Sequence, residues 1–273
     1  MRRSTIGVFD SGFGGLTVLK ALLELVPAAD YVYFGDTARL PYGSKSVETV
    51  ARYAVEAAHY LESHGAQMLV IACNTATALA LDQITAAARV PVIGVVEPGA
   101  SAATSASRNR KIVVIGTDAT VSSHAYRKAL EARGLQAREK ACPLLVPLVE
   151  EGWVDHPVTE QVASIYLGEA FADGFHDADT LVLGCTHYPL LKPLLARVTP
   201  AHVRIVDSAE STAREVATHF KQLVPAAVDA SEERRANSRL KFFATDSTEK
   251  FQRLGQRFLG HPIDTVEHVD LKE

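Results

Sequence analysis

Cysteine is scarce in this sequence: Cys73, Cys142 and Cys185 are the only three among 273 residues. A small and odd number of cysteines excludes a scaffold held together by disulfide bonds. We therefore expect three free thiols in a reducing compartment, the cytoplasm.

An excess of charge of one sign is also lacking. The chain carries 28 basic and 32 acidic residues, a formal net charge of -4, so it predicts no basic surface for a nucleic acid or an anionic membrane. No stretch approaches the roughly 18 consecutive apolar residues of a membrane span, and the first residues lack a signal-peptide pattern. We expect neither a nucleic-acid partner nor a membrane partner.

The residues that are present describe an α/β protein. Apolar residues make up 47% of the chain, which is enough for one large domain or two modest ones. Short Val- and Ile-rich runs alternate with stretches of helical period, as parallel sheets with crossover helices require. Helices are predicted at 16–26 and 47–61. Strands are predicted at residues 6–9, 31–34, 68–72, 92–96, 112–115, 180–184 and 203–206.

The sequence contains an internal repeat. Residues 68–75 (MLVIACNT) align without a gap with residues 180–187 (TLVLGCTH), and each segment is a predicted strand that ends in cysteine. Residues 6–11 likewise resemble 112–117, and 92–96 resemble 203–206. We predict two similar doubly wound α/β domains with parallel sheets, related by a pseudo-twofold axis, with the active site in the crevice between them.

The repeat also suggests where the domains divide. The first domain is predicted to comprise residues 1–97 plus 207–273, and the second residues 98–206, because the last segments need a sheet to pack on. Residues 241–244 are predicted to form an edge strand, and residues 248–259 a helix closed by Gly260. The charged stretch 231–239 is interpreted as a solvated linker.

Polar and thiol side chains gather at the predicted carboxyl ends of strands, where ligands bind in open α/β sheets. If the two halves face each other, Cys73 and Cys185 lie on opposite sides of one bound molecule. Two such groups can invert a carbon centre, one removing a proton and the other delivering one to the opposite face. Both sulfurs must then lie close to the reacting carbon, on the order of 7 Å apart, too far for a disulfide.

The two thiols must also differ in protonation. A free thiol with a pKa of about 8.5 is mostly protonated at neutral pH, so one cysteine must be ionised while the other keeps its proton. Asp10 and His187 are the candidates to bias them. The histidines and cysteines show no zinc-ligand spacing, so we expect no metal ion.

Other interpretations remain open from the residues alone. Each cysteine could be a small buried apolar residue, as we expect for Cys142. Residues 12–17 imitate a dinucleotide fingerprint, but Thr17 stands where its third glycine belongs; we expect these glycines to let backbone N–H groups approach a small anion. A cysteine hydrolase that uses Cys185 and His187 leaves Cys73 unexplained. A two-lobed amino-acid-binding module would need neither cysteine.

Five ordered motifs resemble those of the glutamate racemase family. They are FDSGFGGLTV at residues 9–18, YFGDTARLPYG at 33–43, ACNTATA at 72–78, PLVEEG at 147–152 and GCTHYPL at 184–190. The likeness extends from about residue 6 to 220. Related aspartate and hydantoin racemases share the cysteine pair, but the PYG and GCTHY stretches look more like the glutamate enzyme.

The resemblance implies a cofactor-independent interconversion of L- and D-glutamate that supplies D-glutamate for peptidoglycan. It assigns Cys73 and Cys185 as the catalytic acid/base pair and Asp10 and His187 as the groups that assist them. Homodimerisation is an expectation taken from the family. The residues implied to hold the substrate are Asp10, Ser11, Tyr42, Gly43, Asn74, Thr75, Thr186 and His187, and those implied to support the site are Asp36, Glu151 and Thr117.

Overall fold

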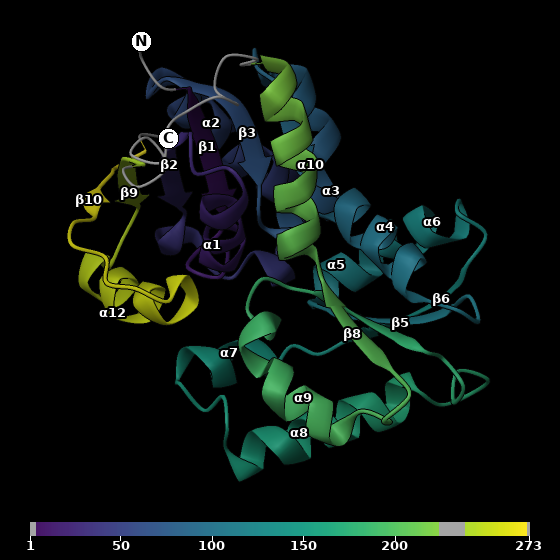
Figure 1. The fold of residues 1–273 in the computed structure, drawn as a ribbon. Coiled ribbons are helices and arrows are strands. Elements are labelled where there is room, and N and C mark those ends of the chain that lie inside the picture. The colour runs from purple at the N-terminus through teal and green to yellow at the C-terminus, as the bar shows by residue number, and fades with distance from the viewer. Residues whose placement is uncertain (1–3, 224–237, 272–273) are drawn as a thin grey trace.

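The computed structural model describes residues 4–223 and 238–271, which form two parallel sheets with helices packed on them (Figure 1). The first sheet has the order β10-β9-β2-β1-β3-β4 and the second the order β6-β5-β7-β8. The predicted α/β class with two parallel sheets is confirmed. The strands of the first sheet are β1 (Thr5–Asp10), β2 (Asp30–Gly35), β3 (Ala66–Ile71), β4 (Val92–Gly94), β9 (Leu240–Ala244) and β10 (Glu267–His268). Those of the second are β5 (Lys111–Gly116), β6 (Gln136–Ala141), β7 (Thr180–Gly184) and β8 (Arg204–Asp207).

The first four strands of each sheet, counted along the sequence, follow the same spatial order. In both sheets the first strand in sequence lies between the second and the third, and the fourth pairs outside the third. The registers also correspond, because Ile6 of β1 lies opposite Met68 of β3 and Ile112 of β5 lies opposite Thr180 of β7. The gap-free alignment of the two cysteine segments therefore reflects equivalent positions in the two sheets.

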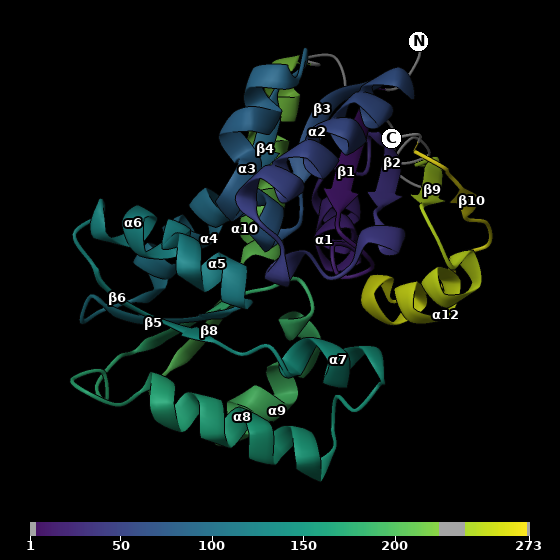
Figure 2. The same cartoon turned by 180° about the vertical axis from the view of Figure 1, so that it is seen from behind.

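Helices cover both faces of each sheet because side chains alternate along the strands. Ile6 and Val8 of β1 belong to the cluster that contains the apolar residues of α1, α10 and α12, whereas Phe9 belongs to the cluster built with α2 and α3. Figures 1 and 2 show these two faces from opposite sides. The helices on the first sheet are α1 (Leu16–Leu25), α2 (Val47–Ser63), α3 (Asn74–Ala87), α10 (Ser208–Leu223) and α12 (Thr248–Leu259).

The second sheet is covered in the same way, and the two lobes share one core. Ile112 and Val114 of β5 pack with α4 and α6, whereas Val113 and Ile115 pack in the cluster that also contains residues of α1 and β1. The helices of the second lobe are α4 (Val96–Ala106), which precedes β5, and α5 (Asp118–Ser123), α6 (Ala125–Glu131), α7 (Leu145–Glu150), α8 (Pro157–Ala170) and α9 (Lys192–Val198), which follow its strands. The short 3-10 helices are η1 (Thr37–Arg39), η2 (Tyr42–Ser44) and η3 (Tyr188–Leu191). No helix in the described part of the chain is long and apolar enough to cross a membrane.

After β8 the chain returns to the first lobe, where α10 packs against α1 and α4. The predicted edge strand 241–244 is β9, but it is not at the edge, because the two-residue strand β10 pairs on its outer side. The predicted final helix 248–259 is confirmed as α12, which ends at Gly260 with φ of 87°. The predicted strand 92–96 stops at Gly94 because α4 begins at Val96.

The strands of the first sheet fall within 1–97 and 207–273, and those of the second fall within 98–206 except that β8 extends one residue further, to Asp207. The exact domain division remains a prediction. Of the predicted linker 231–239, residues 231–237 lie outside the described residues.

Candidate active site

The two cysteines stand at equivalent strand ends and open into the same cavity. Cys73 follows β3 and Cys185 follows β7, and both side chains are almost fully buried. Cys73 is also the N-cap of α3, where its sulfur accepts a hydrogen bond from the N–H of Ala76 at 3.4 Å. The cavity that both line has a volume of about 550 Å³ and is formed by residues of both lobes. The fold thus places two thiols at one potential binding site.

Most of the predicted site residues surround this cavity. Asp10, Asp36 and Glu151 are the exceptions among the described residues. The predicted residues that line it are Ser11, Tyr42, Gly43, Cys73, Asn74, Thr75, Thr117, Cys185, Thr186 and His187. Four charged residues that the sequence did not single out also line it, Asp118, Glu150, Asp246 and Lys250.

Cys73 lies in an environment that favours the protonated thiol. Burial and the nearby charge of Asp10 raise the pKa of Cys73 to about 12, although hydrogen bonds from Ser11 and from backbone N–H groups oppose the shift. Its sulfur lies 3.5 Å from the hydroxyl oxygen of Ser11. At neutral pH this cysteine can therefore act as a proton donor.

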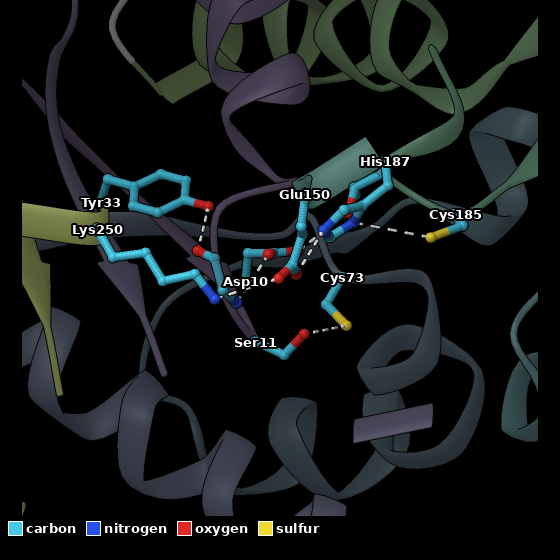
Figure 3. Close-up of polar contacts among 10 residues, drawn as sticks. Asp10, Ser11, Tyr33, Cys73, Glu150, Cys185, His187 and Lys250 are labelled. Atoms are coloured by element: carbon cyan, nitrogen blue, oxygen red, sulfur yellow. Dashed lines mark hydrogen bonds and ion pairs between the residues drawn. The ribbon is translucent and has the colours of Figure 1, made fainter. Parts of the chain in front are cut away.

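Cys185 lies beside a cation. Its sulfur is 3.9 Å from Nδ1 of His187, whose Nε2 is 3.3 Å from Oε1 of Glu150 (Figure 3). Burial acts to lower the pKa of His187, but the hydrogen bonds to Cys185 and Glu150 raise it to about 10. An imidazolium next to a sulfur favours the thiolate. The two thiols consequently stand in opposite electrostatic environments.

The carboxylate that partners His187 is Glu150, the neighbour of Glu151, for which a supporting role was predicted. Helix α7 ends at Glu150, which faces the cavity, and Glu151 is the exposed residue that follows. Burial acts to raise the pKa of Glu150, but the hydrogen bond and charge of His187, together with Lys250, hold it below its usual range. Glu151 does not line the cavity because adjacent residues at the end of a helix point in different directions, and its supporting role stays a prediction.

Asp10 lies behind the cavity, where it connects the two lobes. Its carboxylate accepts a hydrogen bond from the N–H of Gly12 at 2.9 Å and another from the hydroxyl of Thr186 at 3.5 Å. Burial raises the pKa of Asp10, and the charge of His187 opposes that shift. From this position Asp10 acts on Cys73 through its charge and on the second lobe through Thr186.

The glycine-rich turn after β1 is a packing surface for the second lobe. A Cβ atom on Gly14 would lie 2.6 Å from Nδ1 of His187, so only glycine leaves room for that ring. The hydroxyl of Thr17 lies 3.3 Å from the carbonyl oxygen of Thr186. The expectation that these glycines present their N–H groups to a small anion is not met at Gly12, whose N–H is bound by Asp10.

Asp36 acts from behind Tyr42. Its buried carboxylate accepts hydrogen bonds from the hydroxyls of Tyr42 at 2.5 Å and Thr245 at 2.9 Å. Burial raises the pKa of Asp36, and these hydrogen bonds oppose the shift. Asp36 thus orients one wall of the cavity without lining it.

Hydrogen-bond donors face the cavity from both lobes. The hydroxyls of Thr75 and Thr117 lie 2.9 Å apart, and both contact Thr120. Asn74 accepts a hydrogen bond from Tyr126 through Oδ1, but its buried Nδ2 has no partner among the described residues. An unpaired buried amide donor is costly, and a carboxylate in the cavity would satisfy it. No group of three or more potential metal ligands is placed to hold a metal ion in residues 4–223 and 238–271.

Comparison with known proteins identifies the family. The family model described as Asp/Glu/Hydantoin racemase matches residues 6–216. A glutamate racemase from Koribacter versatilis is 60% identical, over 99% of this chain and 98% of its own length. A glutamate racemase isoform from Bacillus anthracis superposes with a TM-score of 0.90 at 38% identity, covering 99% of each chain. A glutamate racemase from Francisella tularensis, solved with D-glutamate, has a TM-score of 0.88 at 33% identity and 98% coverage of each chain. The chain therefore belongs to the Asp/Glu/hydantoin racemase family.

Proposed function

We propose that this protein interconverts L- and D-glutamate by moving the α-proton between the thiols of Cys73 and Cys185, without a cofactor. The observation that carries the proposal is one cavity lined by two repeat-related cysteines in opposite electrostatic environments. The names of the relatives, all glutamate racemases, support glutamate as the substrate.

In one direction of the reaction, Cys185 beside the His187 imidazolium acts as the base and Cys73 acts as the acid. The Cys185 thiolate removes the α-proton from one face of the substrate, so the C–H bond breaks and its electron pair remains on carbon. The thiol of Cys73 then delivers its proton to the opposite face and becomes the thiolate. The product is the other enantiomer, and the reverse reaction exchanges the two roles.

The substrate carboxylates are held by neutral donors. Asn74 Nδ2 is unpaired among the described residues, and the hydroxyls of Thr75, Thr117 and Thr186 line the same cavity. Hydrogen bonds to a charged carboxylate are stronger than those between neutral groups. Enclosure between two lobes also excludes water, which strengthens these bonds and limits stray proton exchange.

An aspartate- or hydantoin-type racemase is the nearest alternative, because the matching family model covers all three substrates. The 60% identity to a glutamate racemase favours glutamate. A binding module without activity would leave the paired thiols without a role. In the cell we place the reaction in the cytoplasm, where it supplies D-glutamate for peptidoglycan.

The experiment that tests this function is exchange of the α-proton in deuterium oxide, followed by mass spectrometry and chiral separation. The wild type should incorporate solvent deuterium into both enantiomers while interconverting them. We expect Cys73→Ser and Cys185→Ser to lose racemisation by at least about 10²-fold, because a hydroxyl is a far weaker acid than a thiol.

Cys142→Ser is the matched control. Cys142 is buried and lies 3.6 Å from the carbonyl oxygen of Lys140, to which a serine hydroxyl can also donate. This variant should keep racemisation close to that of the wild type. Near-normal turnover by either Cys73→Ser or Cys185→Ser would contradict the two-thiol scheme.

A further inference from the structure

Helix α12 reaches across the cleft to the second lobe. Its apolar side chains Phe251 and Leu254 belong to the core of the first lobe, whereas Lys250 points toward the end of α7. Near the end of the same helix, the Phe258 ring contacts the His187 ring edge-on, with 5.2 Å between the ring centres. The helix therefore contacts the Cys185 side of the site through two side chains.

Lys250 binds the carboxylate that holds His187. Its Nζ lies 3.4 Å from Oε2 of Glu150, and the other oxygen of the same carboxylate lies 3.3 Å from Nε2 of His187 (Figure 3). The ammonium also lies 5.5 Å from the centre of the Phe13 ring. The chain of contacts thus leads from α12 through Glu150 and His187 to the sulfur of Cys185.

Glu150 needs a second partner to keep this geometry. It is the last residue of α7, where the carbonyl ends of a helix disfavour a carboxylate. A glutamate side chain held by one hydrogen bond retains several rotamers. With a cation on each oxygen, the carboxylate is fixed between Lys250 and His187.

We propose that Lys250 is a positioning residue for the racemase reaction, which holds Glu150 across the cleft so that His187 stays at Cys185. This inference rests on the proposed function. Lys250 does not need to touch the substrate, and its side chain is nearly half exposed. An ion pair this exposed adds little to stability, so its effect should appear in turnover and not in the unfolding temperature.

The charged groups that face His187 come from three elements. They are Glu150 from α7, Cys185 from the turn after β7 and Asp10 from the end of β1. Lys250 reaches His187 through Glu150 in this arrangement. Loss of the Lys250 charge by itself would raise the pKa of His187, because both groups are cations. If Lys250 positions Glu150, its removal should instead weaken the bond between Glu150 and His187 enough to lower the pKa of His187, so the direction of the shift separates the two effects.

The test compares Lys250→Met, Lys250→Arg and the control Arg253→Met, which removes an exposed cation from the same helix. We expect Lys250→Met to lower kcat on the order of threefold to tenfold with KM and the unfolding temperature little changed. Lys250→Arg should restore most of kcat because it keeps the charge, and Arg253→Met should match the wild type. An unchanged kcat in Lys250→Met overturns the proposal.

A double-mutant cycle separates positioning from attraction of the anionic substrate. In a Glu150→Gln background, Lys250→Met should have no further effect on kcat, because the route through the carboxylate is already broken. If Lys250 instead attracts substrate directly, its removal raises KM by the same factor in both backgrounds. That outcome also overturns the proposal.

A readout that needs no activity distinguishes this inference from the proposed function. The imidazole resonances of His187, assigned by their loss in His187→Asn, should titrate at lower pH in Lys250→Met than in the wild type. An unchanged or higher midpoint counts against Lys250. If the midpoint is lower in Lys250→Met but the wild type does not racemise glutamate, the contacts from Lys250 to His187 are supported and the proposed reaction is rejected.

Discussion

At the scale of single residues, the opposite environments of the two thiols depend on one buried histidine. His187 is 6% exposed, yet its hydrogen bonds to Cys185 and Glu150 outweigh burial and raise its pKa to about 10. At Cys73, burial and the charge of Asp10 raise the pKa of the thiol and so favour its protonated form. The asymmetry therefore arises from which neighbours each sulfur has and not from different burial.

His187 should make folding stability depend on pH. Its folded pKa of about 10 exceeds the unfolded value of 6.5, so the stabilisation is fully present below pH 6.5 and is lost as the pH rises through about 10. We expect the urea midpoint of the wild type to fall over this interval relative to that of His187→Asn. Parallel midpoints for the two proteins from pH 6.5 to pH 10 would show that the imidazolium does not stabilise the fold.

The sequence predicted most of the residues that line the cavity, because the family motifs lie at the predicted carboxyl ends of strands. It singled out Glu151 but not Glu150, because sequence alone does not show which of two adjacent glutamates at the end of a helix faces the cavity. It missed Lys250, whose partner Glu150 is 100 residues away in the chain. Contacts of that separation depend on how the lobes dock, which local pattern does not specify.

At the scale of elements, equivalent strands and their turns position the chemistry. The repeat predicted the shared strand order because the period-2 apolar pattern and the cysteine at the strand end occur twice. The position of β9 inside the sheet was not predicted, since a two-residue strand such as β10 leaves no periodicity to detect. The turn after β1 was recognised as special, but its partner, the turn that carries Thr186 and His187, became evident only from the packing.

That turn gives a prediction at the same scale. Gly14→Ala would place a methyl group 2.6 Å from Nδ1 of His187, so the ring must move and the contact with Cys185 must lengthen. Displacing the His187 ring by about 1 Å should reduce racemisation about 10²-fold. The overpacking should also lower the free energy of unfolding by about 1–3 kcal/mol.

The matched control is Gly168→Ala in α8, where a Cβ would have no atom within 4 Å. In the interior of a helix this change should stabilise the protein by about 0.5–1 kcal/mol without affecting racemisation. Equal kinetics for Gly14→Ala and Gly168→Ala would mean that His187 tolerates displacement.

At the scale of the whole molecule, the substrate should hold the two lobes together. Residues of both lobes line the 550 Å³ cavity, and the two lobes also share one apolar core. A ligand that binds only the folded protein stabilises it by mass action, by about 2.7 kcal/mol at 100 times its Kd. In a protein of this size that corresponds to a rise in the unfolding temperature of about 5–10 °C.

Comparing glutamate with aspartate at equal concentration turns this rise into a test of substrate choice. Both enantiomers of glutamate should raise the unfolding temperature, because their two carboxylates reach donors on both lobes. Aspartate is one methylene shorter and should leave the Asn74 Nδ2 donor unpaired, at a cost of about 1–3 kcal/mol, which removes most of the rise. Asn74→Leu should reduce the effect of glutamate toward that of aspartate. A larger rise with aspartate than with glutamate would assign this cavity to the other branch of the family.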